Sequence, residues 1–160
     1  QVLALARRFD TTLVALVMDE SGISPTVDGR VKACEKIADA CRRHEVPLDR
    51  VYFDPLVLPV SADVGQGLVT LATISEIKRR YPESKTIMGL SNISYGLPAR
   101  QRLNSAFLHM AVYAGLDAAI ANPMNEELMA AVKTAEVLVG RDRHCRRYVK
   151  AFRVPTKPPS

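Results

Sequence analysis

The amino-acid sequence predicts an α/β fold with a parallel sheet, and three observations support this prediction. Four apolar stretches rich in β-branched residues each precede a stretch with helical spacing. These stretches begin about 30 to 40 residues apart, which is the usual length of one βα unit. Each is followed by a polar residue, namely Asp19, Asp54, Asn92 or Asn122. Because right-handed crossovers bring the ends of parallel strands to one edge of a sheet, these residues predict a polar rim.

The bulk composition is that of a globular chain with one core. Of its 160 residues, 48% are hydrophobic and 24% are charged. The net charge of +5 is spread over helix faces without interleaved aromatic residues, which argues against a nucleic-acid site. Apolar runs fall short of the roughly 20 residues that span a membrane. The three cysteines form no C-x-x-C pair, and Cys34 and Cys41 share one predicted helix face, so a reducing, cytoplasmic setting is expected.

The first unit follows a short helical start. Residues 1–9 resemble the end of a helix, and with no initiator Met before them the chain is expected to begin inside a larger domain. Residues 11–18 form a continuous apolar run, typical of a strand buried on both faces. A loop follows, and residues 29–45 have the apolar spacing of a helix.

The second unit places a carboxylate directly after a strand. Residues 51–53 form the strand, Asp54 follows it, and Pro55 should end it because proline cannot donate to the ladder. A buried carboxylate is costly unless it is paired or bound, so Asp54 is a candidate site residue. The helix of this unit is predicted over 63–80.

The third unit contains the most polar of the four loops. A strand over 85–90 passes into Ser91, Asn92 and Ser94, and a helix follows over 98–114. Ligands bind at this edge in parallel α/β folds, although serine and asparagine also serve simply to cap helices. The loop alone leaves both readings open, and the polar rim favours a site.

The fourth unit has a strand over 115–121 and a helix over 125–139, with Asn125 as its N-cap. An amphipathic surface helix is predicted over 141–153, and residues 154–160 are predicted to be a flexible tail.

Two architectures fit four such units. One is a small doubly wound sheet, and the other is half of a (β/α)8 barrel, which the helical start favours. The sequence contains no G-x-G-x-x-G, G-x-x-x-x-G-K-[ST] or G-x-S-x-G motif. The three histidines lie far apart on predicted helices, so no metal site is expected.

The chemistry of the rim favours a neutral heterocycle. The Asp54 carboxylate can accept two hydrogen bonds from a paired N–H edge, such as that of an aminopyrimidinone. The Asn92 amide can donate or accept, so it can follow a ring nitrogen through a change of protonation. A phosphate ligand is disfavoured, because a carboxylate repels it.

As a set, four segments resemble the pterin-binding methyltransferases, which comprise the methyltetrahydrofolate:corrinoid/iron–sulfur protein methyltransferases and the folate domain of cobalamin-dependent methionine synthase. The segments are Tyr52–Leu56, Gly89–Ser94, Arg100 with Asn104, and Gly115–Ile120. The resemblance implies a TIM barrel of the dihydropteroate synthase type, with this chain as its last four βα units. Residues 1–153 would then be the C-terminal part of one barrel domain.

The resemblance also implies a reaction, the transfer of the N5 methyl group of 5-methyltetrahydrofolate to the Co(I) of a corrinoid (cobalamin) carried by a partner protein. Asn92 is the implied catalytic residue near pterin N5. With Asn92 itself, the substrate-binding candidates are Asp54, Ser91, Arg100 and Asn122. Tyr95 stands where the family can have glutamine, and any contact of that glutamine is not expected here.

The expected partners are the corrinoid protein, folate and a second copy of the chain, without nucleic acid or membrane. A non-catalytic half-barrel that binds folate weakly or not at all is the alternative. A dihydropteroate synthase would require lysine where Ser91 and Asn92 stand.

Overall fold

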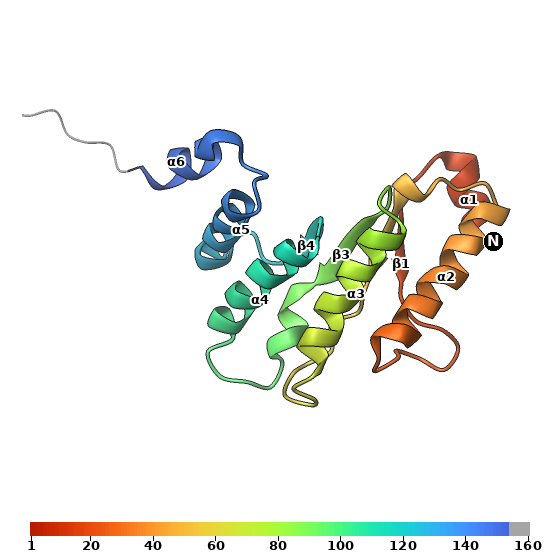
Figure 1. Cartoon of the computed structure of the whole chain (residues 1–160), viewed down its shortest axis with the longest axis horizontal. Coiled ribbons are helices and arrows are strands. Elements are labelled where there is room, and N and C mark those ends of the chain that lie inside the picture. Colours follow the sequence, from red (N-terminus) through yellow and green to blue (C-terminus); the bar gives the residue numbers. More distant parts are fainter. Residues whose placement is uncertain (154–160) are drawn as a thin grey trace, which may run out of the picture.

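The computed structural model describes residues 1–153 and shows one parallel sheet with helices packed against it (Figure 1). Each strand lies beside the next in sequence, and all pairs are parallel, in the order β1 (Leu13–Leu16), β2 (Val51–Asp54), β3 (Lys85–Gly89) and β4 (Ala118–Ile120). The register pairs Leu16 with Asp54 and Gly89 with Ile120. The predicted α/β fold with a parallel sheet is therefore confirmed.

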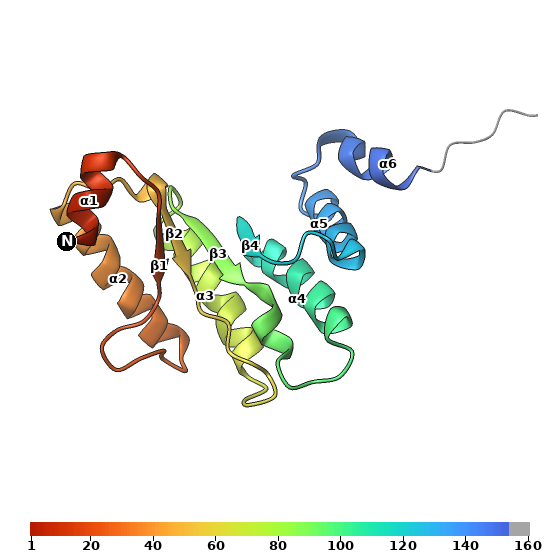
Figure 2. The ribbon, with the colours of Figure 1, turned by 180° about the vertical axis from the view of Figure 1, so that it is seen from behind.

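The helices cover one face of this sheet, except for the last described one, which packs against the helix before it. They are α1 (Val2–Phe9), α2 (Val27–Arg43), α3 (Gln66–Arg80), α4 (Arg100–Ala114), α5 (Glu126–Leu138) and α6 (Arg146–Phe152), with 3₁₀ turns η1 (Leu48–Arg50), η2 (Leu90–Ser94) and η3 (Arg143–Cys145). Helix α3 lies in front of the strands in Figure 1 and behind them in Figure 2. Consecutive strand order with the helices on one face argues against a doubly wound sheet, in which helices cover both faces.

The core lies between the sheet and the helices, in two clusters. One joins α1 and α2 to β1 and β2 and includes Cys34, Cys41 and Phe53, so the two cysteines do share the buried face of α2. The other joins α3, α4 and α5 to β3 and includes Met88 and Phe107. Because both clusters use the same side of the strands, the opposite side has no covering layer within residues 1–153.

The uncovered face corrects one prediction. Residues 11–18 were expected to form a strand buried on both faces, but β1 is shorter and alternates between partly buried and exposed residues. Val14 and Leu16 are 54% and 49% exposed, and Ile120 on β4 is 61% exposed. The prediction is wrong for residues 1–153, in which β1 is an edge strand and one of its faces has no partner.

Several predicted boundaries shift for local reasons. Helix α3 begins at Gln66 instead of 63, since the Asp63 carboxylate accepts hydrogen bonds from the Gly65 N–H and the Gln66 side chain. Strand β4 is shorter than 115–121, because Gly115 ends α4 in the left-handed conformation, with φ 114°. Asn125 caps α5 as predicted, accepting from Leu128 N at 3.0 Å.

The predicted continuous helix over 141–153 is wrong. His144 and Cys145 both have positive φ, 56° and 54°, so the segment breaks into η3 and α6. Asp142 supports the break by accepting hydrogen bonds from Arg147 N at 3.2 Å and Tyr148 N at 2.9 Å. The predicted tail, residues 154–160, lies outside the described residues.

Candidate functional site

The polar residues predicted to form a rim follow the carboxyl ends of the strands, at one edge of the sheet. Asp54 is the last residue of β2, Asn92 lies in η2 after β3, and Asn122 follows β4 by two residues. Asp19 is separated from the end of β1, and its carboxylate accepts hydrogen bonds from Ser21 and Lys36. The hydrogen bonds from Ser21 lower the pKa of Asp19, which is thus engaged within its own loop.

Asp54 is a buried carboxylate without a cationic partner among residues 1–153. Only 9% of the residue is exposed. Its Oδ1 accepts a hydrogen bond from Leu56 N at 2.8 Å. Burial raises the pKa of Asp54, and the Leu56 N–H opposes this effect. A buried acid with one protein partner has hydrogen-bonding capacity left for a ligand.

Asn92 is exposed on the neighbouring loop, and its amide orientation is defined by one contact. Its Nδ2 donates to the carbonyl oxygen of Val57. Since a carbonyl can only accept, the amide nitrogen must face Val57 and Oδ1 must face away. Within the described residues Oδ1 makes no hydrogen bond, and the second hydrogen of Nδ2 is also unbonded. The amide can therefore both accept a hydrogen bond from a ligand and donate one to it.

Asp54 and Asn92 hold the same short segment of backbone. The Leu56 N–H donates to Asp54, and the carbonyl of the following residue, Val57, accepts from Asn92. A further bond from Val60 N to Ile93 O, 3.0 Å long, joins the loop after β2 to η2. The two main site candidates are therefore coupled through the Asp54–Val57 turn.

Arg100 and Ser91 belong to the same loop system. Arg100 donates from Nη2 to the Ser91 carbonyl at 2.6 Å and from Nε to Ser94 Oγ at 3.0 Å. Ser94 is buried and donates in turn to Asn104 Oδ1 at 2.8 Å. Two of the three guanidinium nitrogens of Arg100 thus hold η2 to α4, and Nη1 is the one that makes no bond within the described residues.

Asn122 is not brought into this network. Its side-chain oxygen accepts from Met124 N at 3.0 Å and forms a local turn before α5. Within residues 1–153 it makes no hydrogen bond to the loops that carry Asp54 and Asn92. Its assignment to substrate binding stays a prediction.

Sequence reasoning missed Arg30, which lies directly behind the Asp54–Val57 turn. The residue is fully buried in α2, and its guanidinium donates to the carbonyls of Pro55 and Leu56, both at 3.0 Å. A signal was present in the sequence, because Arg30 is three residues after Val27 and four before Cys34 and so falls on the apolar stripe of the helix.

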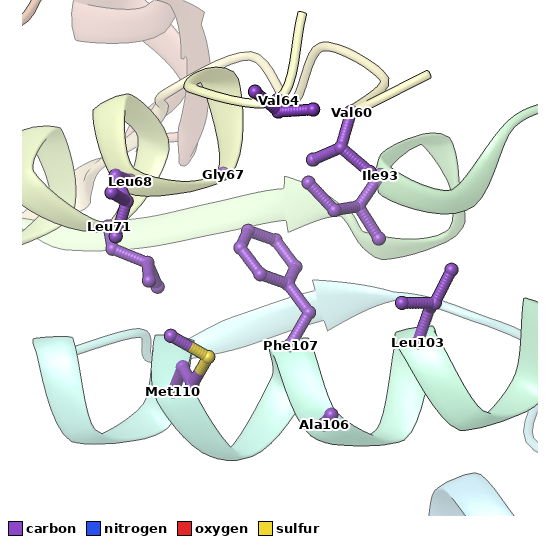
Figure 3. A pocket seen from close by; sticks show the side chains of 10 residues that line it. All are labelled: Val60, Val64, Gly67, Leu68, Leu71, Ile93, Leu103, Ala106, Phe107 and Met110. Carbon is purple, nitrogen blue, oxygen red and sulfur yellow. The ribbon is translucent and has the colours of Figure 1, made fainter.

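A separate apolar groove of about 210 Å³ lies between α3 and α4 (Figure 3). Its lining consists of Val60, Val64, Gly67, Leu68, Leu71, Ile93, Leu103, Ala106, Phe107 and Met110. None of these side chains can transfer a proton, so the groove offers no acid–base chemistry. No group of three or more metal-ligating side chains occurs in residues 1–153. Over the same residues, every helix is too short or too polar to cross a membrane.

Comparison with known proteins supports the family resemblance. The chain matches the family described as pterin binding enzyme over residues 1–122, a range that includes the five candidate site residues. It is 36% identical over 141 residues to the methylcorrinoid:tetrahydrofolate methyltransferase of Eubacterium limosum, covering 88% of this chain and 52% of that protein.

Two methionine synthases are also similar. The chain is 36% identical over 137 residues to the synthase of Mycobacterium tuberculosis, covering 78% of this chain and 12% of the synthase. For the synthase of Mycobacterium leprae the identity is 37% over 127 residues, with 75% and 10% covered. The chain thus spans about half the length of the first relative and about a tenth of the synthases. From the family match and these identities, the chain belongs to the pterin-binding methyltransferase family.

Proposed function

We propose that this chain forms one wall of a folate site and that the complete protein transfers the N5 methyl group of 5-methyltetrahydrofolate to the Co(I) of a corrinoid. The corrinoid arrives on a partner protein, so no residue here is assigned to hold it. The observation that carries the proposal is that one turn binds two side chains, a buried carboxylate that has no cationic partner within residues 1–153 and an exposed amide of defined orientation. The family membership and the methyltransferase relative support it.

Asp54 would bind and orient the pterin. The amino and ring N–H groups of an aminopyrimidinone present two parallel donors, and an ionised carboxylate accepts such a pair. One carboxylate oxygen already accepts from Leu56 N, which fixes the plane of the group before the ligand arrives. Burial makes each hydrogen bond to this carboxylate stronger than it would be in water.

Asn92 would act at N5. A tertiary amine is a poor leaving group, and a hydrogen bond that strengthens as charge changes on N5 lowers the barrier to transfer. The amide has both a free acceptor and a remaining donor hydrogen, so it can contact N5 before and after protonation. The same contacts serve the reverse transfer, from methylcorrinoid to tetrahydrofolate, the pair named in the Eubacterium limosum relative.

The complete site requires a second wall. The face of the sheet that carries Val14, Leu16 and Ile120 is open, and the chain spans 52% of the first relative. Four further strands would cover that face and close a (β/α)8 barrel, in which ligands bind at the carboxyl ends of the strands. Residues 1–153 would then be the C-terminal part of the barrel domain. A homodimer and a cytoplasmic location stay predictions.

Replacing Asp54 with asparagine is expected to weaken binding of 5-methyltetrahydrofolate to the complete protein by about tenfold or more, because a charge-assisted pair of hydrogen bonds is lost. Isothermal titration calorimetry measures the dissociation constant. The matched control is Asp39→Asn, on the exposed surface of α2, which should leave affinity unchanged. Unaltered affinity in Asp54→Asn would restrict the carboxylate to packing or solvation.

The same variant should be more stable than the native protein at neutral pH. Burial raises the pKa of Asp54, so the folded protein holds the proton more tightly than the unfolded chain does. The stabilisation by the protonated acid is complete below the unfolded-state pKa and is lost as pH rises through the folded-state pKa. Asparagine has no charge to bury, so its melting temperature should exceed that of the native protein at pH 7, with the gap narrowing in acid. A lower melting temperature at pH 7 would contradict this expectation.

A further inference from the structure

Arg30 is a buried cation that forms no ion pair within residues 1–153. It is 0% exposed, and no carboxylate among residues 1–153 lies within ion-pair distance of its guanidinium. Burying a charge without a counter-charge costs free energy even when its hydrogen bonds are made. The first turns of a helix are also an unfavourable place for a cation, because the helix dipole is positive there. The role of the guanidinium must therefore lie in the groups to which it donates.

The hydrogen bonds of Arg30 converge on the turn after β2. Nη1 donates to Pro55 O and Leu56 O, both at 3.0 Å, and to Thr70 Oγ1 at 3.3 Å. Nη2 donates to Gln66 Oε1 at 2.8 Å, and Nε donates to Ser24 O at 2.9 Å. The guanidinium therefore connects the loop before α2, the start of α3 and two consecutive carbonyls of the turn.

That turn has a conformation that requires support. Leu56 has φ 61°, in the left-handed region that a leucine rarely occupies and that costs of order 1 kcal/mol or more. This conformation lets the Leu56 N–H face Asp54 while the Leu56 carbonyl faces Arg30. The next carbonyl, of Val57, is the acceptor that orients Asn92. The backbone groups that Arg30 binds are thus adjacent to those that bind Asp54 and Asn92.

We propose that Arg30 is a positioning residue for the folate site, holding the Pro55–Val57 backbone so that Asp54 and Asn92 keep the orientation that binds the pterin. This inference rests on the proposed function, because it requires that Asp54 contact the ligand. Arg30 itself is buried behind the turn and touches no ligand.

Arg30→Met in the complete protein is expected to weaken binding of 5-methyltetrahydrofolate by about tenfold, with retention of the native circular dichroism spectrum. Methionine fills the space that the aliphatic part of the arginine side chain occupies, but it supplies no hydrogen-bond donor to the turn. The matched control is Arg43→Met, on the exposed end of the same helix, which should bind like the native protein. Native affinity in a folded Arg30→Met would overturn the proposal.

A double-mutant cycle separates positioning from general support of the fold. If Arg30 acts through Asp54, adding Arg30→Met to Asp54→Asn should change folate affinity by less than about twofold, because the shared contact is already lost. Independent, additive losses would overturn the proposal. If Asp54→Asn alone leaves affinity unchanged, the proposed function fails first, and the positioning role fails with it.

Arg30→Lys keeps the test decisive should Arg30→Met fail to fold. An ammonium group retains the charge but cannot span Ser24, Gln66 and the turn, whose acceptors lie around a planar guanidinium. The expected result is a folded protein with folate affinity reduced by about fivefold or more. Native affinity in Arg30→Lys would show that the charge alone suffices, and the guanidinium geometry would lose its role.

Discussion

Replacing Asn92 with alanine is expected to lower the rate of methyl transfer by the complete protein by roughly 10²-fold, and by at least tenfold, while the protein stays folded. The expected loss is in kcat, because the proposed hydrogen bond to N5 would strengthen only as the charge on that nitrogen changes. Folate affinity should change less, since Asp54 remains. Single-turnover transfer to the corrinoid, followed by its absorbance change, measures the chemical step apart from binding.

The control for Asn92 is Gln101→Ala, which removes an amide of similar chemistry from the exposed surface of α4. It should transfer the methyl group at the native rate. Because Asn92 also binds the Val57 carbonyl, the melting temperature of Asn92→Ala must be measured alongside. Turnover equal to that of the native protein would remove Asn92 from the mechanism.

The isolated 160-residue chain is expected to transfer methyl groups at less than about 1% of the rate of the complete protein. The loops that carry Asp54 and Asn92 are intact, but nothing in residues 1–153 would hold a ligand from the open side of the sheet. A ligand bound by one wall is neither oriented nor shielded from water, and both effects are required for fast transfer. The assay uses the purified chain, verified by mass, with corrinoid protein and 5-methyltetrahydrofolate.

Fast methyl transfer by that preparation would contradict the half-site interpretation and would require this chain to supply both walls, for example through self-association. Sedimentation of the active sample would then identify the assembly. Weak folate binding without transfer fits the proposal, because Asp54 and its turn are present in the chain.

The position of the candidate site was predictable from the sequence because it follows from the direction of the strands. Asp54 after a strand and Asn92 in the next loop carry their own signal, since polar residues at parallel strand ends share one edge. Pro55 marked the end of β2, and Asn125 marked the start of α5. In each case the signal depends on a few neighbouring residues.

Other features depend on contacts that local patterns do not contain. The position of Arg30 on an apolar stripe indicates burial, but the groups that it binds are known only once the loop 25 residues further along the chain is placed over it. The exposed face of β1 depends on what covers the sheet, and its apolar run alone suggests burial on both faces. The break at His144 and Cys145 depends on Asp142 accepting hydrogen bonds from two backbone N–H groups, and helical spacing alone suggests one continuous helix.

The order of the strands has a consequence for how the protein can be made. Each unit makes its main contacts with the unit before or after it in the chain, so the sheet extends in the order of synthesis. Each strand therefore pairs with the strand of the unit made just before it and does not wait for one from a more distant unit. The seams of the complete barrel would then lie only at β1 and β4. Two separately expressed halves, mixed after purification, should therefore reassemble along those seams and bind folate more tightly than either half does alone.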